Sequence, residues 1–354
     1  MEAAITIAGE ALQELVRNIL SAHGVPFPKA ALVAEALIAA NRRGVDSHGV
    51  LLLPFYLEQL RCGNMDAQAE GHVVSESGSC LVYDGNHGIG HSTAAACCDH
   101  AVRLAQAFGM GLAIARNSCH FGAAAFWAQR ISGRGMLGMA FTNASASVPP
   151  WQGREGRIGT NPICMSLPSC GPGGWLLDMA TTTVAKNRLY KAEACGEATI
   201  PAGWAMDASG VPTQDLRTAL SGLLMPLGGY KGSGLGMMVE ILCGVLSGGA
   251  MTTQLGGLHS TAHRMYTSHC FLAIDISRLM PLEEFQSRME FLIGTVKSSK
   301  PAQGFEEVLV AGDPEWRAEE RRTREGIPLD AGVWSRLSAL AGECGVPLPR
   351  SSPA

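Results

Sequence analysis

The chain has 354 residues, of which 47% are hydrophobic and 16% charged, and its formal net charge is −4 at pH 7. This content is enough for one large domain or two interleaved ones. It offers no basic surface for nucleic acid or an anionic membrane, and no apolar run of about 18 residues that would span a bilayer. The first residues also lack the basic and apolar segments of a secretory signal, so we expect a cytoplasmic protein whose partner is a small molecule.

The cysteines and histidines indicate neither a disulfide framework nor a metal site. Eleven cysteines are scattered without a C-x-x-C pair, which favours reduced and mostly buried thiols. Ten histidines form no compact group of ligands. We therefore predict that the protein holds no metal.

Apolar residues at helical spacing predict three helices near the start of the chain, at about 12–20, 28–43 and 54–63. The second and third are joined by the short connection 45–49, which carries polar side chains. From residue 79 onward the pattern changes to an alternation of strands and helices, which is typical of an α/β protein. The predicted strands are 80–83, 112–115, 136–142, 163–167, 175–179 and 270–276, and the predicted helices are 92–108, 122–132, 233–246, 281–293, 314–325 and 330–344.

The glycines from Gly133 to Gly138 match the pattern G-x-G-x-x-G of Rossmann dinucleotide sites. That motif needs a strand before the glycines and a helix after them, so that the helix N-terminus faces the pyrophosphate. Here a predicted helix precedes the glycines and a strand follows. We therefore interpret them as a turn, and the chain also lacks the P-loop and nucleophile-elbow motifs.

The connection between the second and third helices carries Ser47 and His48. Hydride transfer to a carbonyl or imine needs a proton donor at the heteroatom, and a histidine can provide one near neutral pH. Spacing alone leaves open the simpler alternative that His48 only bonds the backbone at a helix end.

His120 follows a predicted strand, and the carboxyl ends of strands gather ligand groups in α/β proteins. It is a second candidate acid or base, although it could instead cap the next helix. Asp178 lies in an apolar strand, where a carboxylate is costly to bury without a partner. We expect that partner to be His48, with a structural salt bridge as the alternative.

Two glycine-containing segments, 159–162 and 228–234, combine backbone freedom with amide donors. The second carries Lys231 and precedes a predicted helix, so it is suited to bind an anion. Either segment could equally be an ordinary tight turn.

Taken together, the motifs resemble the malate/L-lactate dehydrogenase family, which includes ureidoglycolate, sulfolactate and diketogulonate dehydrogenases and cyclic ketimine reductases. The resemblance runs almost end to end. Its motifs are RGVDSHG (43–49), NSCHFGA (117–123), VPPWQGREGRIGTNP (148–162), LDMATT (177–182), IPAGWAMD (200–207), PLGGYKGSG (226–234) and REGIPL (324–329).

The resemblance implies an α/β fold with a non-Rossmann nicotinamide-binding domain and a mixed sheet, packed on a helical domain formed by both chain ends. Residues 1–70, completed by 311–354, would form the helical domain, and 71–310 the cofactor-binding and dimerisation domain. It implies His48 as acid/base with Ser47 and Asp178 behind it, His120 as a second candidate, and a homodimer. The implied NAD or NADP site is lined by Thr142, Asp178, Met179, Ala180, Lys231, Gly232, Gly312 and Asp313, and the implied substrate site by Leu52, Arg154, Thr160 and Asn161.

Three positions depart from the family pattern. Leu52 stands where an arginine usually grips the substrate carboxylate, and this loss should weaken simple 2-oxo acids unless Arg154 or Arg157 compensates. Ala311 replaces a usual proline, and 186–188 reads KNR where RGK is common.

The sequence therefore predicts NAD(P)H-dependent reduction of a small 2-oxo acid or cyclic imine, or the reverse oxidation, with His48 as proton donor. One alternative is a homologue that binds the cofactor but takes an altered substrate or has no turnover. Another is an acyl-transfer hydrolase built on Ser47, His48 and Asp178. No motif chooses between NADH and NADPH.

Overall fold

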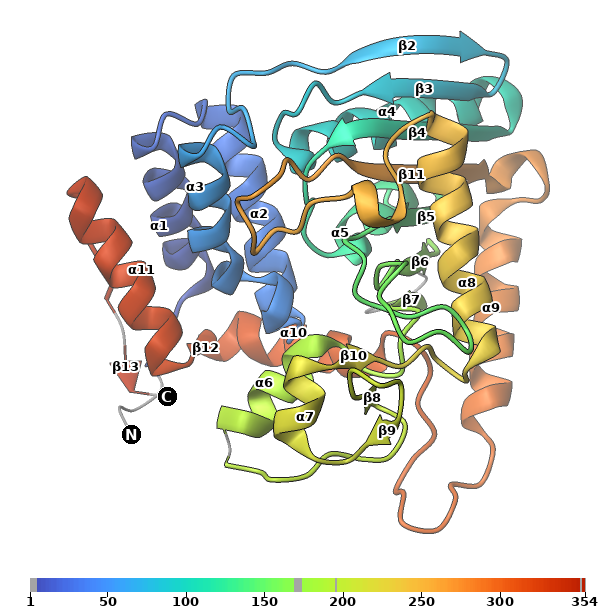
Figure 1. Cartoon of the computed structure of the whole chain (residues 1–354). Coiled ribbons are helices and arrows are strands. Elements are labelled where there is room, and N and C mark those ends of the chain that lie inside the picture. Colours follow the sequence, from blue (N-terminus) through green and yellow to red (C-terminus); the bar gives the residue numbers. More distant parts are fainter. Residues whose placement is uncertain (1–4, 169–173, 195, 351, 354) are drawn as a thin grey trace.

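The computed structural model describes residues 5–168, 174–194, 196–350 and 352–353. Helices from both ends of the chain pack together on one side of the molecule (Figure 1). They are α1 (Gly9–Ala22), α2 (Phe27–Arg42), α3 (Leu53–Arg61), α10 (Asp313–Glu325) and α11 (Ala331–Cys344). The strand β1 (Ile5–Ile7) pairs antiparallel with both β12 (Ile327–Leu329) and β13 (Ser352–Pro353), so the two chain ends share a small sheet. We therefore propose that the boundaries between the helical domain and the cofactor-binding domain lie at residues 70 and 310.

The rest of the protein is built on a seven-stranded mixed sheet in the order β2-β3-β4-β11-β5-β6-β7. Its strands are β2 (His72–Ser77), β3 (Cys80–Asp84), β4 (Met110–Ser118), β5 (Met136–Thr142), β6 (Ile163–Ser166), β7 (Leu176–Met179) and β11 (Thr267–Asp275). Within this sheet only β3 and β4 run parallel. A Rossmann sheet is mostly parallel, so the non-Rossmann prediction is confirmed.

Helices cover both faces of this sheet. Along β4, Ala113 and Ala115 pack against α4 (Gly90–Phe108) and α5 (Ala124–Ser132), whereas Ile114 faces the opposite side. There it meets α8 (Tyr230–Glu240) and the π-helical turn η3 (Ile241–Val245) that continues it. This alternation follows from the two-residue repeat of a strand. The segment 133–135 is the expected turn, since α5 ends at Ser132 and β5 starts at Met136.

A small lobe, residues 184–224, carries its own core. It contains α6 (Lys186–Ala194), β8 (Ala205–Met206), β9 (Pro212–Thr213), α7 (Leu216–Ser221) and β10 (Leu223–Leu224). The remaining elements are α9 (Leu282–Lys297) and the 3-10 turns η1 (Asp46–His48), η2 (Val50–Leu52), η4 (Thr252–Gln254) and η5 (Ile276–Arg278). In the part of the chain described, no helix is long and apolar enough to cross a bilayer. Cys170 and Cys195 lie outside the described residues, and the other nine cysteines carry free thiols.

Candidate active site

The connection between α2 and α3 is held rigidly by side chains from two helices. The amide of Asn41, at the end of α2, donates to Asp46 Oδ1 at 2.7 Å and accepts from the Val50 N–H at 2.8 Å. Arg322 of α10 donates to both carboxylate oxygens of Asp46, at 2.6 and 3.0 Å. These bonds hold the first residue of η1, Asp46, and the residue that begins η2, Val50, and Ser47 and His48 lie between them.

His48 is half-buried, and its Nδ1 lies 2.9 Å from the Ser47 hydroxyl. A hydroxyl can either donate to this nitrogen or accept from it, so the contact suits both protonation states of the ring. Burial lowers the pKa of His48 below the ordinary value. The ring is consequently neutral near pH 7 in the absence of a ligand.

His120 lies just after the end of β4, as the sequence predicted, and its ring is nearly parallel to that of His48. The ring centroids are 5.9 Å apart and the planes differ by 18°. The His120 Nδ1 is 2.7 Å from the Tyr56 hydroxyl and accepts from the Gly122 N–H at 3.2 Å. It does not cap α5, whose N-cap is Ala123. Two candidate acid/base groups from distant parts of the chain thus face each other.

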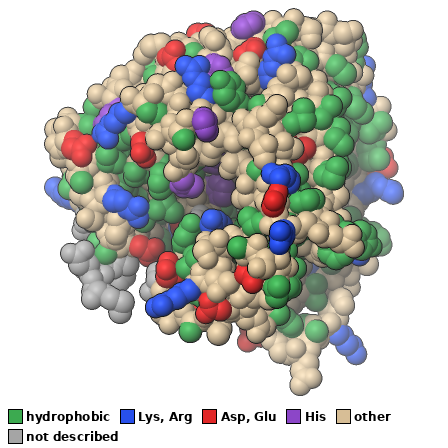
Figure 2. All heavy atoms as spheres, viewed as in Figure 1, with side chains coloured by type: hydrophobic (Ala, Val, Ile, Leu, Met, Phe, Trp, Pro, Cys, Tyr) green, Lys and Arg blue, Asp and Glu red, His purple; other side chains and the backbone are tan. Residues whose placement is uncertain are grey.

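The second ring nitrogen of each histidine, Nε2, is left without a protein partner in the described residues. No described residue forms a hydrogen bond with Nε2 of His48 or His120, and neither atom is among the buried, unpartnered ones. Figure 2 shows histidine side chains inside a hollow near the middle of this face, between the N-terminal helices on the left and the small lobe below. Because the two rings face each other and neither Nε2 is taken by a described residue, one bound substrate could contact both rings.

Asp178 binds the N-terminus of α5 rather than His48, which corrects the expected pairing. Its Oδ2 accepts from the Ala125 N–H at 2.9 Å, and no hydrogen bond between Asp178 and His48 is found in the described residues. A helix N-terminus stabilises a carboxylate and satisfies it without a histidine. The Asp178 side chain is accessible to solvent at its surface, but the protein around the carboxylate removes much of its hydration. This loss of hydration raises the pKa of Asp178 to about 6.

The raised pKa of Asp178 predicts a pH-dependent stability. Because the folded protein holds this proton more tightly than the unfolded chain, whose value is near 3.8, the free energy of unfolding should fall as pH rises from about 4 to about 6. Asp178→Asn keeps an oxygen for the Ala125 N–H but cannot titrate. Urea unfolding of both proteins between about pH 4 and pH 7 should give curves that diverge over this interval. Parallel curves would show that Asp178 has an ordinary pKa.

The end of β7 meets the start of α8, and this brings four predicted cofactor residues together. The chain leaves β7 through Met179 and Ala180, and the Thr181 carbonyl then accepts from the Leu227 N–H at 3.0 Å. The Leu227 carbonyl in turn accepts from the Gly232 N–H at 2.7 Å. The side chain of Lys231, next to it, is exposed and forms no ion pair or hydrogen bond with any described residue.

Other predicted cofactor residues lie elsewhere. Gly312 and Asp313 begin α10 beside Leu176, at the opposite end of β7, and Asp313 is engaged by Lys297 at 2.8 Å and by the Val310 N–H at 2.9 Å. Thr142 is buried, with its hydroxyl 2.8 Å from Nδ1 of His269. Burial lowers the pKa of His269 to about 3, so this pair is a neutral structural contact.

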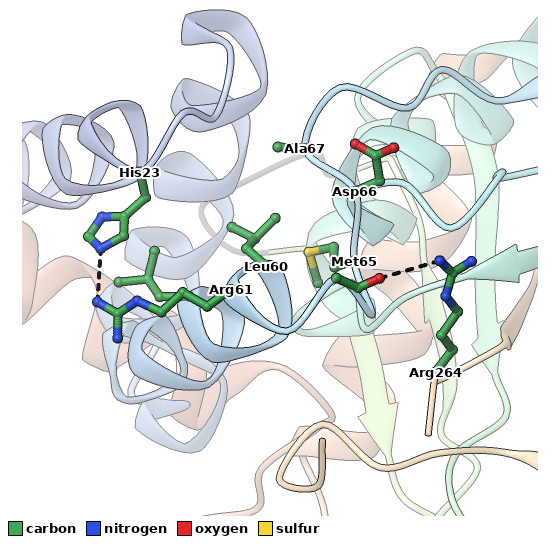
Figure 3. Close-up of a pocket in the computed structure, with 9 residues that line it drawn as sticks. His23, Leu60, Arg61, Met65, Asp66, Ala67 and Arg264 are labelled. Atoms are coloured by element: carbon green, nitrogen blue, oxygen red, sulfur yellow. Dashed lines mark hydrogen bonds between the residues drawn. The ribbon is translucent and has the colours of Figure 1, made fainter. Parts of the chain in front are cut away.

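A separate cavity of about 360 Å³ lies against α3 (Figure 3). It is lined by His23, Leu57, Leu60, Arg61, Gly63, Met65, Asp66, Ala67 and Arg264. None of the predicted site residues borders it. The region around His48 and His120, and not this cavity, is therefore the candidate active site.

Comparison with known proteins decides the family. A family model described as malate/L-lactate dehydrogenase matches residues 7–338. The chain belongs to this family. Malate dehydrogenase of Pyrococcus abyssi is 34% identical over 350 residues, which cover 97% of this chain and 96% of that one. The (2R)-3-sulfolactate dehydrogenase (NADP(+)) of Chromohalobacter salexigens is 38% identical over 229 residues, covering 65% of this chain and 68% of that one.

The solved structures show the same family fold. The Δ1-piperideine-2-carboxylate reductase of Pseudomonas syringae has a TM-score of 0.84 at 29% identity, and the match covers 95% of this chain and 99% of that one. In the described part of the present family member, no three His, Cys, Asp or Glu side chains are arranged to hold a metal ion.

The predicted substrate residues are not all accessible in this family member. Asn161 is fully buried and uses its whole amide internally: it donates to the Gly236 carbonyl and to Glu240, and it accepts from the Ala144 N–H. Asn161 therefore joins the backbone at Ala144 to the helix α8 and does not contact a substrate, which corrects the expected role. The helices α1, α2, α3, α10 and α11 and the strands β1, β12 and β13 form what we call the helical unit. Leu52 is 5% exposed and packs in the core of this unit, so it does not face open space.

The remaining substrate candidates are loop residues. The Thr160 carbonyl accepts from the Thr181 N–H at 2.9 Å, and the exposed Arg154 packs over Gly210 of the small lobe. Arg157 is paired with Glu155. Tyr56, which contacts His120, was missed because nothing in the pattern of α3 separates it from ordinary core residues.

Proposed function

We propose that this protein is an NAD(P)H-dependent oxidoreductase that reduces a small 2-oxo acid or a cyclic imine, or oxidises the corresponding product. The observation that carries the proposal is the facing pair His48 and His120, each with an open Nε2. The names of the family relatives support the reaction class, since they include a malate dehydrogenase, an NADP(+) sulfolactate dehydrogenase and a piperideine-carboxylate reductase.

His48 is proposed to supply the proton to the substrate oxygen or nitrogen. Its Nδ1 keeps a hydrogen-bond partner in either protonation state, because the Ser47 hydroxyl can both donate and accept. As negative charge develops on the heteroatom, a proton on Nε2 becomes more favourable and can then be passed on. The rigid η1 turn keeps the ring in place during this transfer.

The start of α8 fits a dinucleotide phosphate. Lys231 offers a cation that no described residue neutralises, and it lies in the first turn of an 11-residue helix, where backbone N–H groups favour negative charge. Met179 and Ala180 lie close to this turn. When bound, the nicotinamide would supply the hydride to the substrate carbon.

The structure bears differently on the two alternatives, the acyl-transfer hydrolase and the homologue without turnover. An acyl-transfer hydrolase needs a carboxylate that orients the histidine, but Asp178 binds the Ala125 N–H instead, so that reading has little support. A homologue without turnover is separated from an active enzyme only by experiment.

The test is a fluorescence titration of the purified protein with NADH and with NADPH, followed by absorbance assays with pyruvate, oxaloacetate, 2,3-diketogulonate and piperideine-2-carboxylate. We expect binding of at least one nucleotide and turnover of at least one substrate. Binding without turnover of any substrate would favour the homologue that only binds cofactor. No binding of either nucleotide would refute the proposal.

We also propose that the protein is a homodimer. Tyr230, Met237, Ile241 and Val245 are exposed and recur at helical spacing along α8 and η3. A second copy could cover this stripe. Ile241→Glu should then reduce the mass measured by light scattering from two chains to one, whereas Leu279→Glu, at an exposed apolar residue outside the stripe, should not. A wild-type monomer would contradict the proposal.

A further inference from the structure

In the part of the chain that the structure describes, Tyr56 makes the one hydrogen bond between the helical unit and the ring nitrogens of His120. It lies on α3, is 2% exposed, and packs edge-on against His91 at 5.4 Å between ring centroids. Its hydroxyl is 2.7 Å from His120 Nδ1. The contact thus connects the helical unit to a residue that follows the central sheet.

The backbone fixes which partner donates in this contact. The Gly122 N–H can only donate, and it points at His120 Nδ1 at 3.2 Å. Nδ1 must therefore offer a lone pair, and the Tyr56 hydroxyl, facing the same lone pair, must be a donor as well. A proton on Nδ1 would oppose the Gly122 N–H, because an amide N–H cannot accept it.

We infer that Tyr56 is a positioning residue that holds His120 as a neutral imidazole with its proton on Nε2. The inference rests on the proposed function for its catalytic meaning. His120 then acts as a hydrogen-bond donor that polarises the C=O or C=N group, as neutral histidines do in other enzymes, while His48 transfers the proton.

The surroundings favour the same neutral form. His120 precedes the N-terminus of α5, whose partial positive charge opposes a cation. Burial, and then the histidines at 48, 91, 269 and 259, lower the pKa of His120 well below its ordinary value. The other titratable groups nearby are Tyr56, whose pKa is raised by burial, and Cys119, whose pKa burial raises to about 12.

The test is a long-range ¹H–¹⁵N NMR spectrum of protein labelled in its histidine rings, with the His120 signals assigned by their loss in His120→Gln. At pH 7 the wild-type spectrum should show Nδ1 without a proton and Nε2 with one. This measurement needs neither nicotinamide nor turnover, so its failure is distinct from failure of the proposed function. A wild-type His120 that carries its proton on Nδ1, or is cationic at pH 7, would overturn the inference without any variant.

Tyr56→Phe then tests the residue itself. Loss of the hydrogen bond to Nδ1 should move part of the neutral His120 population to the tautomer with its proton on Nδ1 and lower kcat about fivefold to tenfold, with little change in KM for the nucleotide. Tyr83→Phe is the matched control, because Tyr83 is also a buried tyrosine but faces His100. His120 signals that are the same in Tyr56→Phe as in the wild type would assign Tyr56 to packing alone.

Discussion

Replacing His48 by alanine is expected to lower kcat by roughly 100-fold to 10,000-fold, the range that a general acid or base contributes. The substitution removes the side chain that contacts Ser47, but it leaves the hydrogen bonds that Asn41 makes with Asp46 and with the Val50 N–H, and the ion pair between Arg322 and Asp46. Nucleotide affinity should stay within a few-fold of wild type. Steady-state kinetics and fluorescence titration of the same preparation measure both quantities.

A control and a second variant separate His48 from His120. His100→Ala removes a partly exposed histidine beside Arg103 and should keep full activity. His120→Ala should also reduce kcat strongly, but the ionisation of His48 should remain in its pH–rate profile. If His48→Ala retained wild-type turnover and His120→Ala abolished that ionisation, the two roles would have to be exchanged.

Gly232→Ala is expected to lower the free energy of unfolding by about 3 kcal/mol. A Cβ at this position would lie 2.6 Å from the Thr181 carbonyl oxygen, 2.5 Å from the Leu227 carbonyl oxygen and closer still to the Leu227 nitrogen. These are backbone atoms that cannot move aside as a flexible side chain would. The start of α8 would therefore have to separate from the segment after β7, and nucleotide binding should weaken with it.

Gly234→Ala is the matched control for this effect. Gly234 lies two residues further along α8, and a Cβ there would meet nothing within 4 Å. Alanine is the better helix former, so this variant should gain about 0.5–1 kcal/mol in urea unfolding. Equal stability of the two variants would mean that Gly232 does not pack against the backbone of Thr181 and Leu227 in solution.

Most of the architecture could be predicted because its elements carry strong periodic patterns. The helices 9–22 and 90–108 bury one apolar face each, and the strands 110–118 and 136–142 are rich in buried apolar residues. The strand β2 was missed because all six of its residues are exposed, so no alternation marks it. The helix α6 was missed because it is short and mostly polar.

The candidate site was predicted less completely, since side-chain partners depend on tertiary structure. The contact between Ser47 and His48 is local and follows from adjacency in the chain. Asp178 was expected to pair with His48, but a helix N-terminus reached its carboxylate instead. No sequence pattern shows that Leu52 turns into the core or that Tyr56 reaches His120 across 64 residues.

The ion pair between Asp46 and Arg322 has a consequence for how the protein is made. The turn that carries His48 is translated early, but the arginine that fixes it lies 276 residues later in the chain. During synthesis at roughly 5–20 residues per second, the early helices therefore wait many seconds before the turn gains this partner. A nascent chain can assemble the helices that surround the site long before the site itself has its final shape.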